Sequence, residues 1–131
     1  MMQLDLFSAP PLPIPVDRPT VLRVDLGSHS YGQVILVTLD DGTWGYGSDD
    51  QFQGYCGHGH GVWPKKDGYP TARDAVAVAL DHLHDRWTRL TVDKSSCCTD
   101  KHRAAARRGL EWIGRQYLAY GLDPKPERAA A

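Results

Sequence analysis

Three short stretches that follow one another along the chain carry hydrophobic patterns typical of strands: the first alternates, the second is a β-branched run, and the third places Trp44 and Tyr46 on one face after a turn. Residues 21–26 read VLRVDL, residues 33–39 read QVILVTL, and residues 40–47 read DDGTWGYG. Alternation with a period of two is typical of strands, and a β-branched run is typical of a more buried strand. Asp41 and Gly42 form a hairpin turn signal. These patterns predict three antiparallel strands connected as a meander.

The second half of the chain carries two helical patterns. Thr71 followed by Asp74 resembles a capping box, and apolar residues then recur at alternating spacings of four and three. The apolar positions are Val76, Leu80, Leu83, Trp87 and Leu90. A second helix is predicted over residues 99–120, with stop signals at Gly121 and Pro124. The expected fold is therefore α+β: a small antiparallel three-stranded sheet followed by two helices packed on one side.

The chain is expected to divide into three parts. Five prolines lie between residues 8 and 20, a composition that favours polyproline II geometry and could extend to about 40 Å. The stretch PPLPIP within it also resembles ligands of proline-recognition domains. We expect residues 1–20 to form a flexible N-terminal docking peptide and proline-rich linker. Residues 21–122 are expected to form a single α+β domain, and residues 123–131 a C-terminal tail.

Composition and charge narrow the class of protein. The 131 residues include 15 basic and 16 acidic side chains, a net charge of −1, which argues against an acidic mimic of nucleic acid and against a uniformly basic protein. No stretch approaches the roughly 20 apolar residues that cross a bilayer, and the N-terminus does not resemble a signal peptide. Three cysteines, two of them adjacent, make a poor disulfide framework. We expect a cytoplasmic protein without a membrane partner.

The stretch YCGHGHGVW is a candidate metal site. If it is extended, Cys56, His58 and His60 share one side of the strand, and thiolate and imidazole are ligands that zinc favours. Candidates for a fourth ligand are Cys97, Cys98 and His102. No paired Cys-x-x-Cys spacing supports a zinc ribbon. The prediction is that the protein holds no resident metal or cofactor, and a metal-dependent enzyme built on these three residues is kept as an alternative.

Acidic residues and histidines also adjoin one another on the first predicted helix. His82 and His84 lie beside Asp81 and Asp85, a combination that can carry out acid–base chemistry. Their positions place them on the polar side of the helix, where such residues are usually solvated, and Asp85 has helix-stabilising spacing to Arg89. No nucleophile elbow, phosphate-binding loop or His-Glu-x-x-His motif is present. We therefore predict that the protein is not an enzyme.

The second predicted helix carries an excess of cations along one broad arc. Its basic residues are Lys101, Arg103, Arg107, Arg108 and Arg115, with Glu111 the single acid among them. Such a face contacts solvent in any amphipathic helix, but an excess of cations also suits phosphate contacts. We interpret the arc as a candidate surface for DNA binding without sequence selectivity, because no groove-reading pair of helices accompanies it.

Five residues ahead of the proline run, QLDLF, contain three large apolar side chains, which a solvated tail usually lacks. They resemble the pentapeptide by which bacterial DNA polymerases and repair proteins dock on the β sliding clamp. The resemblance implies that Gln3 holds the peptide through its amide, that Leu4 makes a shallower contact, and that Asp5 lies at the polar rim. It implies that Leu6 and Phe7 fill a hydrophobic pocket of the clamp.

The resemblance predicts a small non-catalytic accessory protein that docks on the bacterial β sliding clamp. The central residues are only faintly similar to small accessory proteins of phages and plasmids, which suggests a role in mobile-element DNA metabolism. An alternative is a phage- or plasmid-encoded inhibitor of a host replication or defence component, similar in that respect to anti-CRISPR proteins. A clamp-binding peptide is compatible with both, because an adaptor and an inhibitor would occupy the same pocket.

Overall fold

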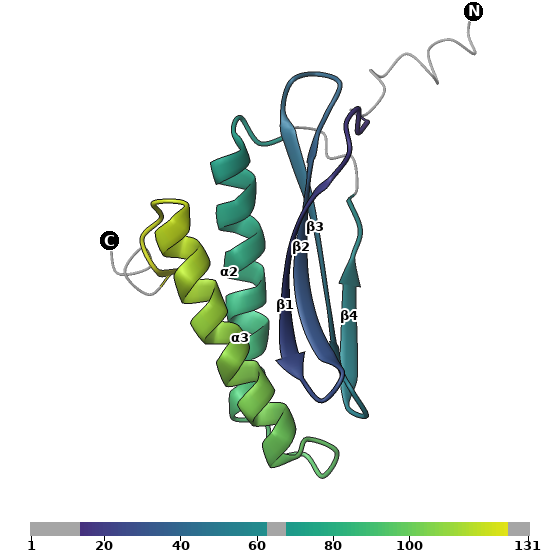
Figure 1. The fold of residues 1–131 in the computed structure, drawn as a ribbon, viewed down its shortest axis with the longest axis vertical. Helices are drawn as coiled ribbons and strands as arrows, with labels where there is room; N and C mark the ends of the chain where they lie inside the picture. Colours follow the sequence, from purple (N-terminus) through teal and green to yellow (C-terminus); the bar gives the residue numbers. More distant parts are fainter. Residues whose placement is uncertain (1–13, 63–67, 126–131) are drawn as a thin grey trace, which may run out of the picture.

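The computed structural model describes residues 14–62 and 68–125 and contains one antiparallel sheet with two helices on one face (Figure 1). The strands follow each other in the sheet in chain order, as a meander. The elements are β1 (Thr20–Gly27), β2 (Ser30–Thr38), β3 (Trp44–Phe52), β4 (Cys56–His60), α2 (Ala72–Thr91) and α3 (Asp100–Ala119). The predicted α+β class, with helices on one side of a meander, is confirmed.

The sheet has four strands where the sequence predicted three. β3 continues beyond Gly47 to Phe52, and β4 pairs with it through a register that runs from Phe52↔Cys56 to Ser48↔His60. The sequence CGHGH of β4 has glycine at alternate positions and no β-branched residue, so it lacks the apolar alternation by which strands are recognised. Main-chain pairing with β3, and side-chain contacts with α2, therefore define this strand.

Both helices begin where the sequence predicted, and each has a threonine as its N-cap. The Thr71 hydroxyl accepts a hydrogen bond from the Asp74 amide at 3.1 Å, which satisfies one of the unpaired donors of the first turn. Thr99 caps α3 in a capping box whose third position is His102 in place of the usual glutamate. The helix ends before Gly121, which has a φ of +65° and so takes the left-handed conformation that terminates many helices.

The centre of the core is Trp87 of α2, which is completely buried. Its indole lies between the backbones of two elements, because a Cβ added to Gly32 of β2 or to Gly109 of α3 would overlap the ring. The indole Nε1 donates a hydrogen bond to the Asp50 carboxylate at 2.8 Å. The largest fully buried side chains around it include Tyr117, Phe52, Leu26, Leu80, Leu83 and Ile113. Glycine is therefore required at two positions so that sheet and helices can close around one indole.

Two glycines of α3 offer a matched test of this packing. A Cβ at Gly109 would lie 2.5 Å from Trp87 Cε3, whereas a Cβ at the exposed Gly114 would meet none of the described atoms within 4 Å. Gly114→Ala is expected to stabilise the protein by about 0.5–1 kcal/mol through helix propensity. Gly109→Ala is expected to destabilise it by about 1–3 kcal/mol through overpacking. Urea unfolding of both variants checks the opposite signs, and stabilisation by both would contradict the packing.

The chain segment before β1 also lies along the sheet. The Val16 amide donates to the Thr38 carbonyl at 3.0 Å, and the Asp40 amide donates to the Ile14 carbonyl at 2.9 Å. The last part of the predicted linker therefore pairs with the end of β2, while residues 1–13, which include the predicted docking peptide, lie outside the described residues. At the other terminus Lys125 forms an ion pair with Asp85 of α2. No helix within the described residues is long and apolar enough to cross a bilayer.

Candidate functional site

The predicted docking peptide, Gln3, Leu4, Asp5, Leu6 and Phe7, lies outside the described residues. The structure does define where the described chain begins relative to the rest of the domain. Ile14 hydrogen bonds to Asp40 in the β2–β3 turn, at one end of the sheet. The α2–α3 connection lies at the other end, where His102 contacts the Gln53 carbonyl in the β3–β4 turn at 2.7 Å. The peptide is thus joined to the end of the domain opposite the start of α3 (Figure 1).

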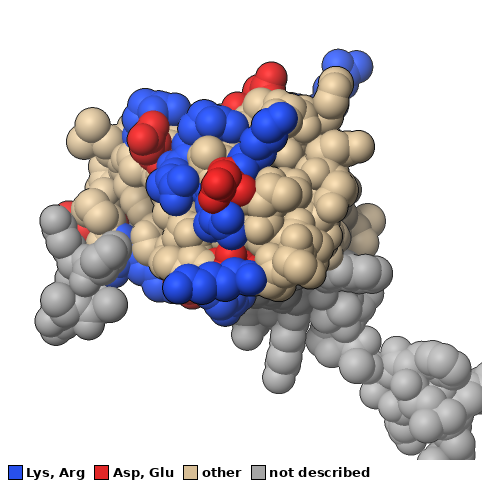
Figure 2. Space-filling model, turned by 90° about the horizontal axis from the view of Figure 1, so that it is seen from below, with Lys and Arg blue, Asp and Glu red and all other residues tan. Residues whose placement is uncertain are grey.

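Lys and Arg side chains gather at the end of the molecule that carries the α2–α3 connection. Figure 2 shows this end, with acidic side chains interspersed among the basic ones. Of the five basic residues predicted to contact nucleic acid, Lys101, Arg107, Arg108 and Arg115 are exposed and Arg103 is partly buried. Exposure alone does not make a cation available, because two of the four guanidinium groups, those of Arg103 and Arg108, are bound within the protein.

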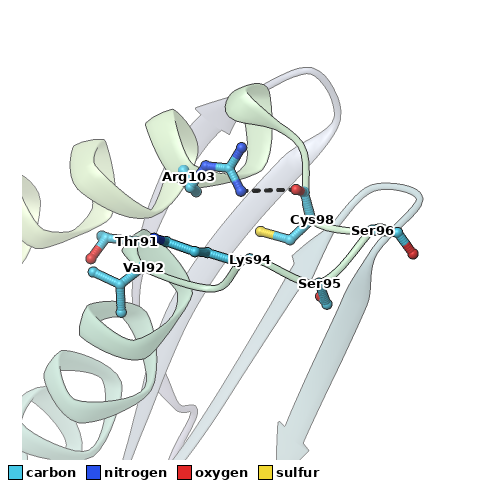
Figure 3. A pocket seen from close by; sticks show the side chains of 7 residues that line it. All are labelled: Thr91, Val92, Lys94, Ser95, Ser96, Cys98 and Arg103. Atoms are coloured by element: carbon cyan, nitrogen blue, oxygen red, sulfur yellow. Dashed lines mark hydrogen bonds between the residues drawn. The ribbon is translucent and has the colours of Figure 1, made fainter.

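Arg103 is held by the loop that precedes its own helix. Its Nη1 donates to the carbonyls of Asp93 at 2.8 Å and Cys98 at 2.9 Å, and its Nη2 forms an ion pair with Asp100 at 2.6 Å. The loop surrounds a pocket of about 540 Å³, and Figure 3 shows the bond from Arg103 to Cys98 beside it. The pocket is lined by Thr91, Val92, Lys94, Ser95, Ser96, Cys98 and Arg103. Arg103 therefore holds together two parts of the α2–α3 connection, at Asp93 and at Cys98.

Arg108 connects α3 to the sheet. Its Nε donates to the Leu26 carbonyl at 3.0 Å, Nη2 donates to the same carbonyl, and the guanidinium lies beside Gly27 at the end of β1. A helical projection places Arg108 on the polar arc. It cannot show that the end of β1 lies close enough for its Leu26 carbonyl to accept a hydrogen bond from this guanidinium. Lys101, Arg107 and Arg115 remain as the members of the predicted arc that are exposed and make no contact of this kind among the described residues.

The histidine-containing strand β4 faces α2. Cys56 Sγ lies 3.5 Å from Arg86 Nη2, and His58 Nε2 lies 3.2 Å from His82 Nε2. The expectation that Cys56 and His58 share one side of the strand is therefore confirmed, whereas the position of the His60 side chain is outside what the structure describes. No group of three histidine, cysteine, aspartate or glutamate side chains among the described residues could hold a metal ion.

The residues considered for a fourth metal ligand lie elsewhere. Buried Cys98 contacts the Leu90 carbonyl at 3.9 Å, Cys97 is exposed in the same connection, and the His102 ring caps α3 and stacks on Tyr55 with centroids 5.0 Å apart. Burial raises the pKa of the Cys56 thiol, against the opposing charge of Arg86. Burial also raises the pKa of Cys98. Both thiols are therefore protonated at neutral pH, unlike the thiolates that act as nucleophiles and metal ligands.

A buried ion pair that the sequence did not indicate lies next to β4. The Asp50 side chain is fully buried and accepts hydrogen bonds from Arg86 Nε at 2.7 Å, Arg86 Nη2 at 3.0 Å and Trp87 Nε1 at 2.8 Å. Burial by itself lowers the pKa of Arg86, but the hydrogen bond and charge of Asp50 raise it by more, so the guanidinium stays charged. The only signal in the sequence was a pair of adjacent acids in β3, Asp49 and Asp50. Which of the two is buried, and what it binds, follows only from the packing of strand against helix.

The neighbouring acids and histidines of α2 contact different parts of the protein. Asp81 accepts a hydrogen bond from the Tyr117 hydroxyl at 2.7 Å, which connects α2 to α3. Asp85 pairs with Lys125, and this hydrogen bond lowers the pKa of Asp85, in place of the pairing with Arg89 that the spacing suggested. His82 faces His58 of β4. The sequence predicted that these residues of α2 face solvent. Asp81, His82 and Asp85 instead contact other parts of the fold.

No protein-family model, curated protein or solved structure matches the chain.

Proposed function

We propose that this protein is a non-catalytic accessory protein that docks on the bacterial β sliding clamp through residues Gln3–Phe7. The observation that carries the proposal is the peptide QLDLF, which resembles the clamp-binding pentapeptide at all five of its positions. Its position ahead of a proline-rich stretch suits a docking peptide, because a partner can reach it without opening the domain.

The composition of the core supports this interpretation of the peptide. The described core is built from β1–β4, α2 and α3, and the apolar residues packed in it or against it lie between Leu22 and Leu122. Leu26, Phe52 and Trp87 are completely buried by these elements. The described elements thus bury an apolar core of their own, as expected of a domain that precedes or follows a separate docking peptide.

The energetics suit a reversible contact. Burying one leucine and one phenylalanine side chain contributes roughly 3–6 kcal/mol in total, from which the ordering of the peptide must be subtracted. The net affinity expected is micromolar at best, about −8 kcal/mol. Such a contact forms and breaks readily, as an accessory protein of the replication machinery requires.

The test is a calorimetric titration of a purified bacterial β clamp with the full-length protein. Saturable binding that an isolated QLDLF peptide displaces would support the proposal, and the absence of heat at clamp concentrations of tens of micromolar would overturn it. Clamp-dependent DNA synthesis in the presence of the protein then separates an accessory protein, which permits or stimulates synthesis, from an inhibitor, which stops it.

Weak binding to DNA is a second proposed activity, favoured by the exposed cations at the α2–α3 end. Binding should be indifferent to sequence and should weaken steeply with salt. Reversing Arg107 to glutamate should lower the affinity severalfold and reduce the salt slope by about 1 or more. Arg108 is unsuitable for this test, because its guanidinium holds the Leu26 carbonyl.

The matched control for Arg107→Glu is Arg18→Glu. Arg18 is exposed and lies between Val16 and β1, at the other end of the sheet, and its reversal changes the net charge by the same amount. Fluorescence anisotropy with a labelled duplex at two salt concentrations measures both variants. Equal losses in the two variants would mean that the net charge, and no particular face, determines binding.

A further inference from the structure

Two imidazole rings face each other between the edge strand β4 and the helix α2. His58 and His82 have their Nε2 atoms 3.2 Å apart, while the ring centroids are 4.9 Å apart and the ring planes are inclined by 42°. Because the nitrogens are much closer than the centroids, the Nε2 edges of the two rings point toward each other. Both side chains are partly buried, so the pair is shielded without being closed to solvent.

The separation of the nitrogens fits two ligands of one metal ion. Zinc binds imidazole nitrogen at about 2.0–2.1 Å with tetrahedral geometry, which places two ligand nitrogens about 3.3 Å apart. Nitrogens at this distance can equally share one proton in a hydrogen bond. Zinc can bind both Nε2 atoms when each imidazole is neutral and carries its proton on Nδ1. The proton between the two Nε2 atoms then moves to the Nδ1 atom of the donor ring, or is released to solvent if both Nδ1 atoms already carry one.

The surroundings keep the two rings in place and contribute little net charge. β4 is paired with β3 along its whole length, and Asp50, opposite His58 in that register, forms the ion pair with Arg86. Arg86 lies one helical turn after His82, so the helix that carries the second imidazole is anchored to the strand next to the first. The charge of Arg86 is balanced by Asp50, so this guanidinium does not oppose a cation bound by the imidazoles.

We propose that His58 and His82 form a binding site for a divalent transition metal ion, zinc above all, that links β4 to α2. Two protein ligands leave coordination positions for water or for a donor from a partner molecule. Such a site exchanges its metal readily, with a micromolar dissociation constant, so purified protein should contain well under one zinc per chain. The ligand pair differs from the Cys56, His58 and His60 set predicted from the sequence, and the site is independent of clamp docking.

The test uses zinc alone as the probe and the full-length protein. Isothermal titration at pH 7.5 should show one zinc bound per chain, with affinity reduced at least tenfold in His58→Ala and in His82→Ala. His29→Asn is the matched control and should bind as the wild type does. His29 is an exposed histidine with a φ of +65° in the β1–β2 turn, a conformation that asparagine tolerates.

Two further measurements keep the test decisive if a variant folds poorly. Zinc binding by the wild type should weaken as the pH is lowered from 7.5 to 5.5, because protons compete with the metal for the imidazole nitrogens. Zinc should also raise the melting temperature at pH 7.5, because the metal joins two elements of the native fold. The proposal is overturned if the wild type binds no zinc at submillimolar concentrations. It is also overturned if folded His58→Ala and His82→Ala both bind zinc with unchanged affinity.

Discussion

Replacing Leu6 and Phe7 together by alanine is expected to remove most of the affinity for a bacterial β sliding clamp, and either replacement alone should reduce it by at least about thirtyfold. The two residues carry most of the apolar area of the docking peptide, and truncating a side chain that fills a pocket commonly costs about 2 kcal/mol or more. Gln3→Ala should also weaken binding, because it leaves polar groups of the pocket unpaired. The measurement is the calorimetric titration of the clamp described above.

The control for this prediction is Asp5→Ser, which should bind nearly as well as the wild type, because the peptide consensus accepts either residue at that position. Removal of residues 1–9 should abolish clamp binding and leave the melting temperature of the domain nearly unchanged. If this deletion lowers the melting temperature by many degrees and the wild type does not bind the clamp, the peptide belongs to the core and the proposed function is wrong.

Replacing Asp50 by alanine is expected to lower the free energy of unfolding by about 3–5 kcal/mol. The substitution leaves the partly buried guanidinium of Arg86 without its counter-charge and the fully buried Trp87 indole N–H without an acceptor. Breaking a buried ion pair from one side is costly because the remaining charge stays in a medium of low polarity. Urea-induced unfolding followed by Trp fluorescence measures the change.

Asp49→Ala is the matched control for Asp50→Ala. Asp49 is the neighbouring residue of β3, points to the sheet face away from the helices and accepts a hydrogen bond from Gln33 Nε2 at 2.9 Å. We expect a loss of about 1 kcal/mol, the typical contribution of one such bond. Adding Arg86→Met to Asp50→Ala should recover part of the lost stability, because the unpaired charge is removed. Equal losses at the two aspartates would show that the ion pair is not what stabilises this part of the fold.

The elements that the sequence predicted are those whose signal is local. The strand that begins at Thr20 follows a period of two, and the strand that begins at Ser30 contains a β-branched apolar run. Both helices begin after a threonine whose side chain caps the first turn. β4 escaped prediction because it contributes little apolar surface of its own. It is defined by main-chain pairing with β3 and by the contacts of Cys56 and His58 with α2, neither of which is encoded in the strand itself.

In the candidate sites, too, the sequence predicted features that depend on neighbouring residues and missed contacts between distant elements. Alternation along β4 correctly placed Cys56 and His58 on one side, but their partners Arg86 and His82 come from a helix more than twenty residues away in sequence. A helical projection identified the basic arc of α3 and could not distinguish Arg107, which is exposed, from Arg108, which binds the Leu26 carbonyl. Partners that are distant in the chain can be assigned only when the packing of sheet against helix is known.

The N-terminal segment joins the domain beside the β2–β3 turn, and this position limits how far the α2–α3 connection can lie from a partner bound to the first residues. The nine residues of β2 span about 30 Å. Because the chain from Ile14 onward lies along the sheet, only residues 8–13 of the proline-rich stretch can add to this length, by about 20 Å at full extension. A molecule anchored by its first residues would therefore carry the cationic tip at the α2–α3 connection as far as about 50 Å from the anchor point. Shortening the proline-rich stretch would reduce that distance without altering either contact, so the two ends of the protein can be adjusted independently.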